Sequence, residues 1–242
     1  MPVGFRVYTH APRPEPALIQ RFATKFTPDL SDAMNRAGTM DGGIRPVYLP
    51  MNKVVGPALT VSVPTGAFNV IKDGMQQTRA GDVLVINARG NLNGALMGGN
   101  VCRGLLHRGL AGVIVDGAIR DVSQIREDGL PVYARGNTTV MGPMDGPGEV
   151  NVPIACGNVV VYPGDIIVGD EDGIVVVRPT EAEEVLDAVA KLEARLAAIQ
   201  PILLRGEVTN IANVEKGLRE QGCEFREEQW HEKHGRLPRT CA

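Results

Sequence analysis

The stretch Gly94–Gly136 reads GALMGGNVCRGLLHRGLAGVIVDGAIRDVSQIREDGLPVYARG, and its order of elements decides the fold. A glycine turn comes first, then a helical run, a glycine, a short apolar strand, and a cation beside an anion. A glycine turn that enters a helix presents free backbone N–H groups, which bind carboxylates and phosphates. Arg120 can hold a carboxylate through two parallel hydrogen bonds, and Asp121 can bind a hard divalent cation. The stretch therefore predicts a site for a small anionic substrate and a metal ion.

Two apolar strands flank this glycine turn. Val83–Ile86 precedes it, Val113–Val115 follows it, and a helix is predicted between them over Val101–His107. The simplest arrangement of a strand, a helix and a second strand is a parallel crossover. Ligand sites in such sheets gather at the carboxyl ends of the strands, which is where Arg120 and Asp121 fall.

Further periodicities predict elements on both sides of this unit. Helices are expected over 17–25, 29–36 and 67–78 and from 121 and 180 onward, and strands over 58–63, 131–134, 159–162, 166–168 and 174–177. The last three strands are expected to form a meander, and 87–93 and 116–117 are expected to be a loop and a turn. Thr180 and Glu183 fit a capping box, and Pro201 is expected to stop the long helix. Strands flanked by helices predict an α/β fold, a sandwich or barrel in a single domain.

The composition excludes several classes of protein. The 242 residues include 43% hydrophobic and 22% charged residues, which is ordinary for a globular protein. A net charge of −3 and 4% aromatic residues give no case for nucleic acid. No segment has the length of a membrane span, and the N-terminus lacks the order of a signal peptide. The four cysteines show no metal-binding spacing, so we expect reduced thiols in a soluble, cytoplasmic protein.

Three other polar groups have simpler interpretations than a site. Ser31 and Asp32 suit the start of a helix, and the acidic cluster 170–172 suits a solvated hairpin turn. His231 and His234 have metal-chelating spacing, but a solvated tail explains them better because no acidic or cysteine partner stands at useful spacing.

Several motifs together resemble a known family. They are Leu30-Ser31-Asp32-Ala33, Val55–Val61, Gly81–Ile86, Gly98-Gly99, Gly112–Asp121, Pro163–Ile167 and Asp172-Gly173. These motifs occur in the same order as in the RraA-like proteins, and the chain resembles that family over residues 17–200. The family includes the 4-hydroxy-4-methyl-2-oxoglutarate/4-carboxy-4-hydroxy-2-oxoadipate aldolases. Residues 1–16 form an N-terminal arm outside the resemblance, and 201–242 form a charged extension expected to pack on a neighbouring subunit or to be partly mobile.

The resemblance implies an α-β-β-α arrangement, homotrimers or homohexamers, active sites at subunit interfaces, Mg²⁺ or Mn²⁺, and 2-oxo acid substrates. By motif, Arg120 would bind the carboxylate of a pyruvyl group and Asp121 would ligate the metal. The turn Gly98-Gly99 would place the backbone amides of Asn100 and Val101 so that they share the carboxylate.

The chain departs from the family pattern at two positions. Active members carry either an Asp at the position of Gly99, or a Gly there with an acidic residue at the position of Gln124. Here both positions lack a carboxylate. Gln124 can hydrogen-bond a water but cannot act as a base. Glu193 on the long helix, from a neighbouring subunit, is a candidate replacement.

These observations lead to a metal-dependent class II aldolase of a 4-hydroxy-2-oxo acid, with possible oxaloacetate decarboxylase activity. Both reactions leave a pyruvate enolate. Aldol cleavage also needs a base to remove the hydroxyl proton, whereas decarboxylation does not, so a neutral Gln124 should impair decarboxylation less. The alternative is a non-catalytic regulator that binds a ribonuclease or another protein. A methyltransferase has little support, because no glycine-rich donor loop follows a strand. Substrate choice is expected to depend on loops 40–52 and 141–150.

Overall fold

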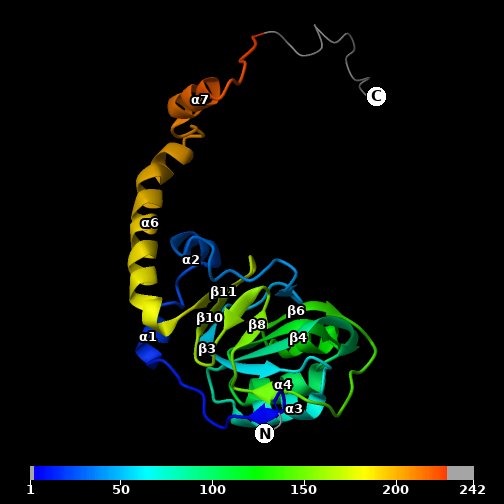
Figure 1. Cartoon of the computed structure of the whole chain (residues 1–242). Coiled ribbons are helices and arrows are strands. Elements are labelled where there is room, and N and C mark those ends of the chain that lie inside the picture. Colours follow the sequence, from blue (N-terminus) through cyan, green and yellow to red (C-terminus); the bar gives the residue numbers. More distant parts are fainter. Residues whose placement is uncertain (1–2, 228–242) are drawn as a thin grey trace, which may run out of the picture. The chain divides into compact units, whose positions relative to one another are not determined.

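The computed structural model describes residues 3–227 of two compact units, Met1–Glu193 and Ala194–Ala242 (Figure 1). The strands are β1 (Arg6–Val7), β2 (Arg45–Pro46), β3 (Val54–Ser62), β4 (Val83–Ala95), β5 (Gly112–Ile119), β6 (Val132–Asn137), β7 (Glu149–Val150), β8 (Ile154–Cys156), β9 (Val159–Val161), β10 (Ile166–Gly169) and β11 (Ile174–Val177). The helices are α1 (Pro16–Gln20), α2 (Thr27–Ala33), α3 (Phe68–Gln77), α4 (Gly99–His107), α5 (Val122–Asp128), α6 (Ala182–Leu203) and α7 (Ile211–Glu220). Within residues 3–227, no helix is long and apolar enough to cross a membrane.

Parallel strands form the centre of the first unit. The main sheet has the order β1-β7-β3-β4-β5-β6-β2, and β3, β4, β5 and β6 run parallel to one another. The predicted crossover is confirmed, because α4 connects the parallel neighbours β4 and β5. The antiparallel hairpin β10–β11 joins the sheet through β3.

Side chains of the central strands alternate between two buried faces. On one face Ile86 packs with Leu105 of α4 and with residues of α3 and α5. On the other face Val85 packs with Tyr133 and with Ile154 of the β8–β9 hairpin. A third cluster joins β10 and β11 to Val185 and other residues at the beginning of α6. The layers are helix, sheet, sheet and helix, so the predicted α/β fold of the α-β-β-α type is confirmed.

The two central strands extend further than the sequence indicates. The predicted loop 87–93 belongs to β4, which continues to Ala95 through two register shifts against β5. The predicted turn Asp116-Gly117 lies inside β5. Polar residues and glycines in both strands interrupt the apolar pattern that predicts a strand. They are tolerated there because β-bulges and the ends of strands accept such residues.

Other local predictions fail because distant residues supply the contacts. β9 pairs with β8 and not with β10, so the predicted meander reduces to the hairpin β10–β11. The carboxylate of Asp170, predicted to be solvated, accepts hydrogen bonds from the Thr27 N–H (2.8 Å) and Oγ1 (2.5 Å) at the start of α2. The capping box of Thr180 and Glu183 does not form: a short 3-10 turn, Pro179–Glu181, leads into α6. Pro201 lies inside α6.

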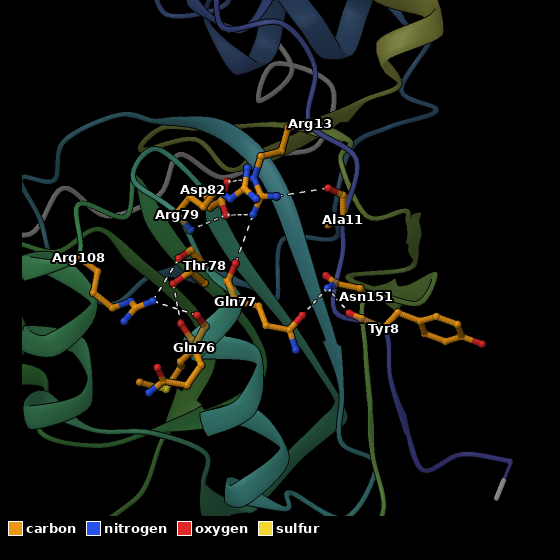
Figure 2. Close-up of polar contacts among 11 residues, drawn as sticks. Tyr8, Ala11, Arg13, Gln76, Gln77, Thr78, Arg79, Asp82, Arg108 and Asn151 are labelled. Atoms are coloured by element: carbon orange, nitrogen blue, oxygen red, sulfur yellow. Dashed lines mark hydrogen bonds and ion pairs between the residues drawn. The ribbon is translucent and has the colours of Figure 1, made fainter. Parts of the chain in front are cut away.

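Within the first unit, the described part of the N-terminal arm contacts later segments of the chain, and Figure 2 shows these contacts for Tyr8 and Arg13. β1 pairs with β7, and the Asn151 Nδ2 donates to the backbone oxygen of Tyr8 at 2.6 Å. Farther along, Arg13 donates two hydrogen bonds to Asp82, at 3.0 and 2.7 Å, and the Asp82 side chain is 3% exposed. Because one partner is buried, this contact ties the arm to the turn before β4.

Of the predicted C-terminal extension, α7 is a short amphipathic helix with exposed apolar residues. His231 and His234 lie outside the described residues.

Candidate functional site

The glycine turn lies where the sequence places it, at the N-terminus of α4. Gly98 is the residue before the helix, in an extended conformation. The Gly99 N–H donates to Asp121 Oδ2 at 3.1 Å. A Cβ on Gly98 would overlap the side chains of Arg120 and Asp121. Glycine at position 98 therefore allows these two side chains to lie against the turn.

Arg120 follows the end of β5 and is fixed beside the same turn. Its backbone N–H donates to the Met97 oxygen at 3.0 Å. Its Nε is inaccessible to solvent, has no hydrogen-bond partner, and lies 3.5 Å from Asp121 Oδ2. The Arg120 side chain as a whole is 40% exposed. A buried donor without a partner costs free energy, and an acceptor placed at the turn would remove that cost.

Asp121 occupies a left-handed backbone conformation, with φ of 61° and ψ of 40°, directly before α5. This conformation is uncommon for a residue with a side chain, and such strain is found at functional sites. Its Oδ2 accepts from Gly99, whereas within residues 3–227 its Oδ1 has no hydrogen-bond partner. The free carboxylate oxygen is therefore available to a ligand.

The side chains at this site limit the kinds of metal ion that it could hold. In the described part of the chain, no group of three or more His, Cys, Asp or Glu side chains is placed to hold a metal. That excludes a dedicated zinc-type cage among these residues. Mg²⁺ is commonly bound through one or two carboxylates with several waters retained, which fits Asp121 with one open oxygen.

The amides of the first turn of α4 are not equally free. The Val101 N–H donates to the Gly98 oxygen at 3.1 Å. Among the described residues, the Asn100 N–H has no hydrogen-bond partner. Of the two amides predicted to share a carboxylate, Asn100 is thus the unoccupied one.

Gln124 fills the space above Gly99. Its Nε2 donates to Asn100 Oδ1 at 3.1 Å. A Cβ on Gly99 would overlap the Gln124 amide. Positions 99 and 124 therefore share one volume, and a side chain at 99 requires the side chain at 124 to move. This coupling gives a steric reason for the pairing of residue types that the sequence pattern indicates.

An ion pair that the sequence analysis missed joins the two helices of the site. Arg103 of α4 donates to both carboxylate oxygens of Asp128 of α5, at 3.0 to 3.1 Å.

The cysteine of α4 is unreactive. Burial raises the pKa of the Cys102 thiol to about 12, so this cysteine is not a nucleophile near neutral pH.

The candidate acid Glu193 already has a partner in its own chain. Both of its carboxylate oxygens accept hydrogen bonds from Lys25 Nζ, at 2.9 and 2.8 Å. Of the two loops expected to select the substrate, 141–150 adjoins the strand that leads to the glycine turn, because the Gly142 N–H donates to the Ala95 oxygen at 2.9 Å. Loop 40–52 instead contacts β6, through β2 and through Asp41.

A second polar cluster lies at the ends of the same strands and was not predicted. Arg135 of β6 donates to both oxygens of Asp41, at 3.0 and 2.8 Å, and through Nε to Asp116 Oδ1 at 2.5 Å. The other Asp116 oxygen accepts from the Gly157 N–H at 3.0 Å, and Asn158 Nδ2 donates to Asp41 Oδ2 at 3.0 Å. The available signal was that Asp116 and Arg135 follow the apolar cores of two predicted strands.

Comparison with known proteins supports the family resemblance. Residues 27–176 match the RraA-like family, described as Aldolase/RraA. A protein of Halalkalibacterium halodurans named "Putative 4-hydroxy-4-methyl-2-oxoglutarate aldolase" is 38% identical over 73% of this chain and 83% of its own length. A Thermus thermophilus protein named 4-hydroxy-4-methyl-2-oxoglutarate aldolase is 37% identical over 43% of this chain and 64% of its own length.

Solved structures agree with these matches. Streptomyces coelicolor RraAS2, described as an unusual member of the RNase ES inhibitor RraA family, has a TM-score of 0.66 and 29% identity over 76% of this chain and 95% of its own. The RNA-processing inhibitor RraA of Thermus thermophilis has a TM-score of 0.58 and 31% identity over 63% of this chain and 92% of its own. The sequence and the fold both place this chain in the RraA-like (Aldolase/RraA) family.

Proposed function

We propose that this chain is a divalent-metal-dependent carbon–carbon lyase of the class II pyruvate aldolase type, acting on a 4-hydroxy-2-oxo acid. The aldolase names of its relatives support the reaction class. The observation that carries the proposal is the buried Nε of Arg120, which donates no hydrogen bond and lies beside a glycine turn at an ion-pair distance of 3.5 Å from Asp121 Oδ2. A substrate carboxylate at this turn would pair with a buried donor that otherwise has no acceptor.

Each residue of the site has a role in this proposal. Arg120 and the Asn100 N–H bind the carboxylate of the pyruvyl group, while Val101 contributes when its N–H leaves Gly98. Gly98 and Gly99 keep the backbone close to the substrate. Asp121, whose Oδ1 has no hydrogen-bond partner among the described residues, would hold Mg²⁺ or Mn²⁺. Such an ion, when bound, supplies Lewis-acid polarisation of the keto group.

The fixed carboxylate orients the bond that breaks. In aldol cleavage the hydroxyl proton passes to a carboxylate of the neighbouring subunit. The carbon–carbon bond breaks, and its electron pair passes into the keto group of the departing pyruvate. Arg120 keeps that bond aligned with the keto group, which lowers the barrier by orientation. The carbon that carried the bond then takes up a proton to give pyruvate.

Gln124 decides which substrate suits the chain best. Its amide is hydrogen-bonded to Asn100 and cannot accept the hydroxyl proton. Decarboxylation of oxaloacetate releases CO₂ without a hydroxyl proton to remove. We therefore propose that oxaloacetate decarboxylation is less impaired than aldol cleavage.

A neighbouring subunit can complete the site. We propose a homotrimer or homohexamer in which an acid from the next subunit meets the exposed side of Arg120 and Asp121. Light scattering of the purified protein measures the number of subunits, and a monomer at micromolar concentration contradicts this part of the proposal.

The function is tested by pyruvate release from 4-hydroxy-4-methyl-2-oxoglutarate and from oxaloacetate, with Mg²⁺, Mn²⁺ or excess EDTA. We expect turnover with metal, none with EDTA, and recovery on adding metal back. Asp121→Asn should lose the metal dependence together with the activity. Equal rates with metal and with EDTA contradict the proposal.

The second candidate is a regulator that binds a ribonuclease. It is favoured by the likeness to solved RraA proteins that are described as RNase or RNA-processing inhibitors, and by the neutral Gln124. Binding of the purified chain to an RNA-degrading endonuclease, without pyruvate release from any 2-oxo acid, would select this candidate.

A further inference from the structure

A cavity of about 600 Å³ lies on the face of the sheet opposite α4 and α5. Its polar lining comes from Asp41, Asn87, Arg89, Asp116, Arg135 and Asn158. Alternation along the strands sets this position: Val85, Ile114 and Tyr133 face the β8–β9 hairpin, and Asn87, Asp116 and Arg135 continue the same rows two residues later. The cavity is therefore separate from the glycine turn, which lies at the N-terminus of α4.

Hydrogen bonds hold the carboxylates of this cavity in place. Arg135 binds Asp41 with two hydrogen bonds and Asp116 with one. Every oxygen of the two carboxylates accepts at least one hydrogen bond from a side chain or the backbone. Satisfied carboxylates beside a second arginine form a poor cation site, because a cation would have to displace these donors.

Arg89 is delivered to the cavity by a strained bulge in β4. Arg89 has φ of 55° and Gly90 has φ of 71°, at the register shift that follows Asn87. The Arg89 N–H donates to Asn87 Oδ1 at 2.8 Å, which holds the bulge. Bulges commonly redirect a side chain next to a site, and left-handed conformations of residues other than glycine persist where the surroundings impose them.

Two donor groups on this wall have no partner among residues 3–227. They are the guanidinium of Arg89 and the Nδ2 of Asn87. Arg135 retains further N–H bonds beyond those it donates to Asp41 and Asp116. Donors thus outnumber free acceptors on this wall, and the only positive charge without a carboxylate partner among these described lining residues is Arg89.

We propose that this cavity is a second ligand site, which binds a small anion through a carboxylate or a phosphate group. Arg89 forms a charge-assisted, two-pronged contact with the anion. Asn87 Nδ2 donates a further hydrogen bond, and the network around Arg135 keeps the wall in place. Because it lies on the face of the sheet opposite the glycine turn, we assign it to an effector and not to the reacting substrate.

The experiment measures binding of inorganic phosphate and of malonate by titration calorimetry at constant ionic strength. It uses Arg120→Ala as the parent protein, so that the glycine turn contributes no binding. We expect saturable binding of at least one anion. The one that binds identifies a phosphate or a carboxylate ligand.

Two variants of the parent test the assignment. Arg89→Gln removes the free charge, and Asn87→Asp keeps the acceptor for the Arg89 N–H while replacing the free donor with a negative charge. Each should weaken binding by about tenfold or more, the usual effect of losing a charge-assisted hydrogen bond. The control is Arg36→Gln, since Arg36 is also an exposed arginine in a left-handed conformation and does not line the cavity.

The outcomes are decisive in both directions. Loss of binding in both variants, with Arg36→Gln unchanged and all proteins folded by circular dichroism, supports the site. No saturable binding of either anion, or equal binding by Arg89→Gln and the parent, overturns it.

Discussion

The carboxyl ends of β4, β5 and β6 carry two polar clusters on opposite faces of one sheet, and the clusters differ in how far their bonds are satisfied. On the α4 side, Arg120 Nε is buried without an acceptor, and Asp121 is strained and retains a free oxygen. On the β8–β9 side, Arg135 is paired with Asp41 and Asp116. Carboxylates whose oxygens all accept hydrogen bonds contribute rigidity, whereas polar atoms that are held in place without a hydrogen-bond partner are prepared to bind a ligand. The difference indicates that chemistry belongs to the Arg120 cluster.

The largest effect is expected from Arg120→Ala. Losing the only charge that fixes the substrate carboxylate should lower kcat/KM for pyruvate release by about 10³-fold, comparable to other losses of transition-state positioning. Steady-state kinetics with excess Mg²⁺ measures this change. The matched control is Arg126→Ala, an exposed arginine on α5, which should change kcat/KM less than about twofold. Retained activity in Arg120→Ala would remove this arginine from the site.

On the opposite face, Arg135→Met should act on stability and not on chemistry. It leaves the buried carboxylate of Asp116 without its partner, and breaking a buried pair in this way costs about 3 kcal/mol. Urea unfolding measures the free-energy difference. The folded variant should retain its kcat, and a kcat that falls as far as in Arg120→Ala would erase the distinction between the two clusters.

The pair of Arg135 with Asp41 gives an acid dependence. The hydrogen bonds from Arg135 lower the pKa of the Asp41 carboxyl. A lowered pKa in the folded state adds stability above the unfolded pKa, and this stability is lost as pH falls through the folded value. Unfolding free energy followed from pH 6 downward should decrease more steeply for the wild type than for Arg135→Met. Parallel curves would contradict the assignment.

A smaller effect is expected where Gly99 and Gln124 share one volume. Gly99→Ala forces the Gln124 amide away and should destabilise the protein by about 1–2 kcal/mol through overpacking. Gln124→Ala alone should cost little, and the double variant should recover most of the loss. A double-mutant cycle of unfolding free energies tests this, and strictly additive effects would show that the two positions do not compete.

The smallest effect is expected from Asp128→Asn. The Arg103 side chain is 48% exposed, so its pair with Asp128 contributes less than about 1 kcal/mol to stability. Because this ion pair joins the helix that carries Asn100 to the helix that Asp121 precedes, KM should rise a few-fold while kcat stays near the wild-type value. Arg103→Lys should also raise KM, since lysine keeps the charge but lacks the planar two-pronged contact with Asp128.

Local pattern predicted the centre of this molecule well, and contacts between distant residues limited the rest. Val83–Ile86 and Val113–Val115 are apolar on both faces, which is typical of buried parallel strands, and the crossover followed from them. The position of Arg120 and Asp121 after β5 followed from the same pattern. The continuation of β4 through Arg89 and Gly90 did not, because a bulge interrupts the alternation on which strand prediction depends.

Contacts such as Asp170 with Thr27, or Arg135 with Asp41, join residues far apart in the chain and leave no local signal. The steric exclusion between Gly99 and Gln124 also became visible only in three dimensions.

The most direct test of the Arg120–Asp121 site is Mn²⁺ binding followed by electron paramagnetic resonance, with and without pyruvate. We predict that the wild type binds Mn²⁺ more tightly when pyruvate is present. Arg120→Ala should bind Mn²⁺ equally with and without pyruvate, and Asp121→Asn should not bind Mn²⁺ under either condition. Equal Mn²⁺ binding by the wild type and Asp121→Asn would show that Asp121 does not hold the metal beside the glycine turn.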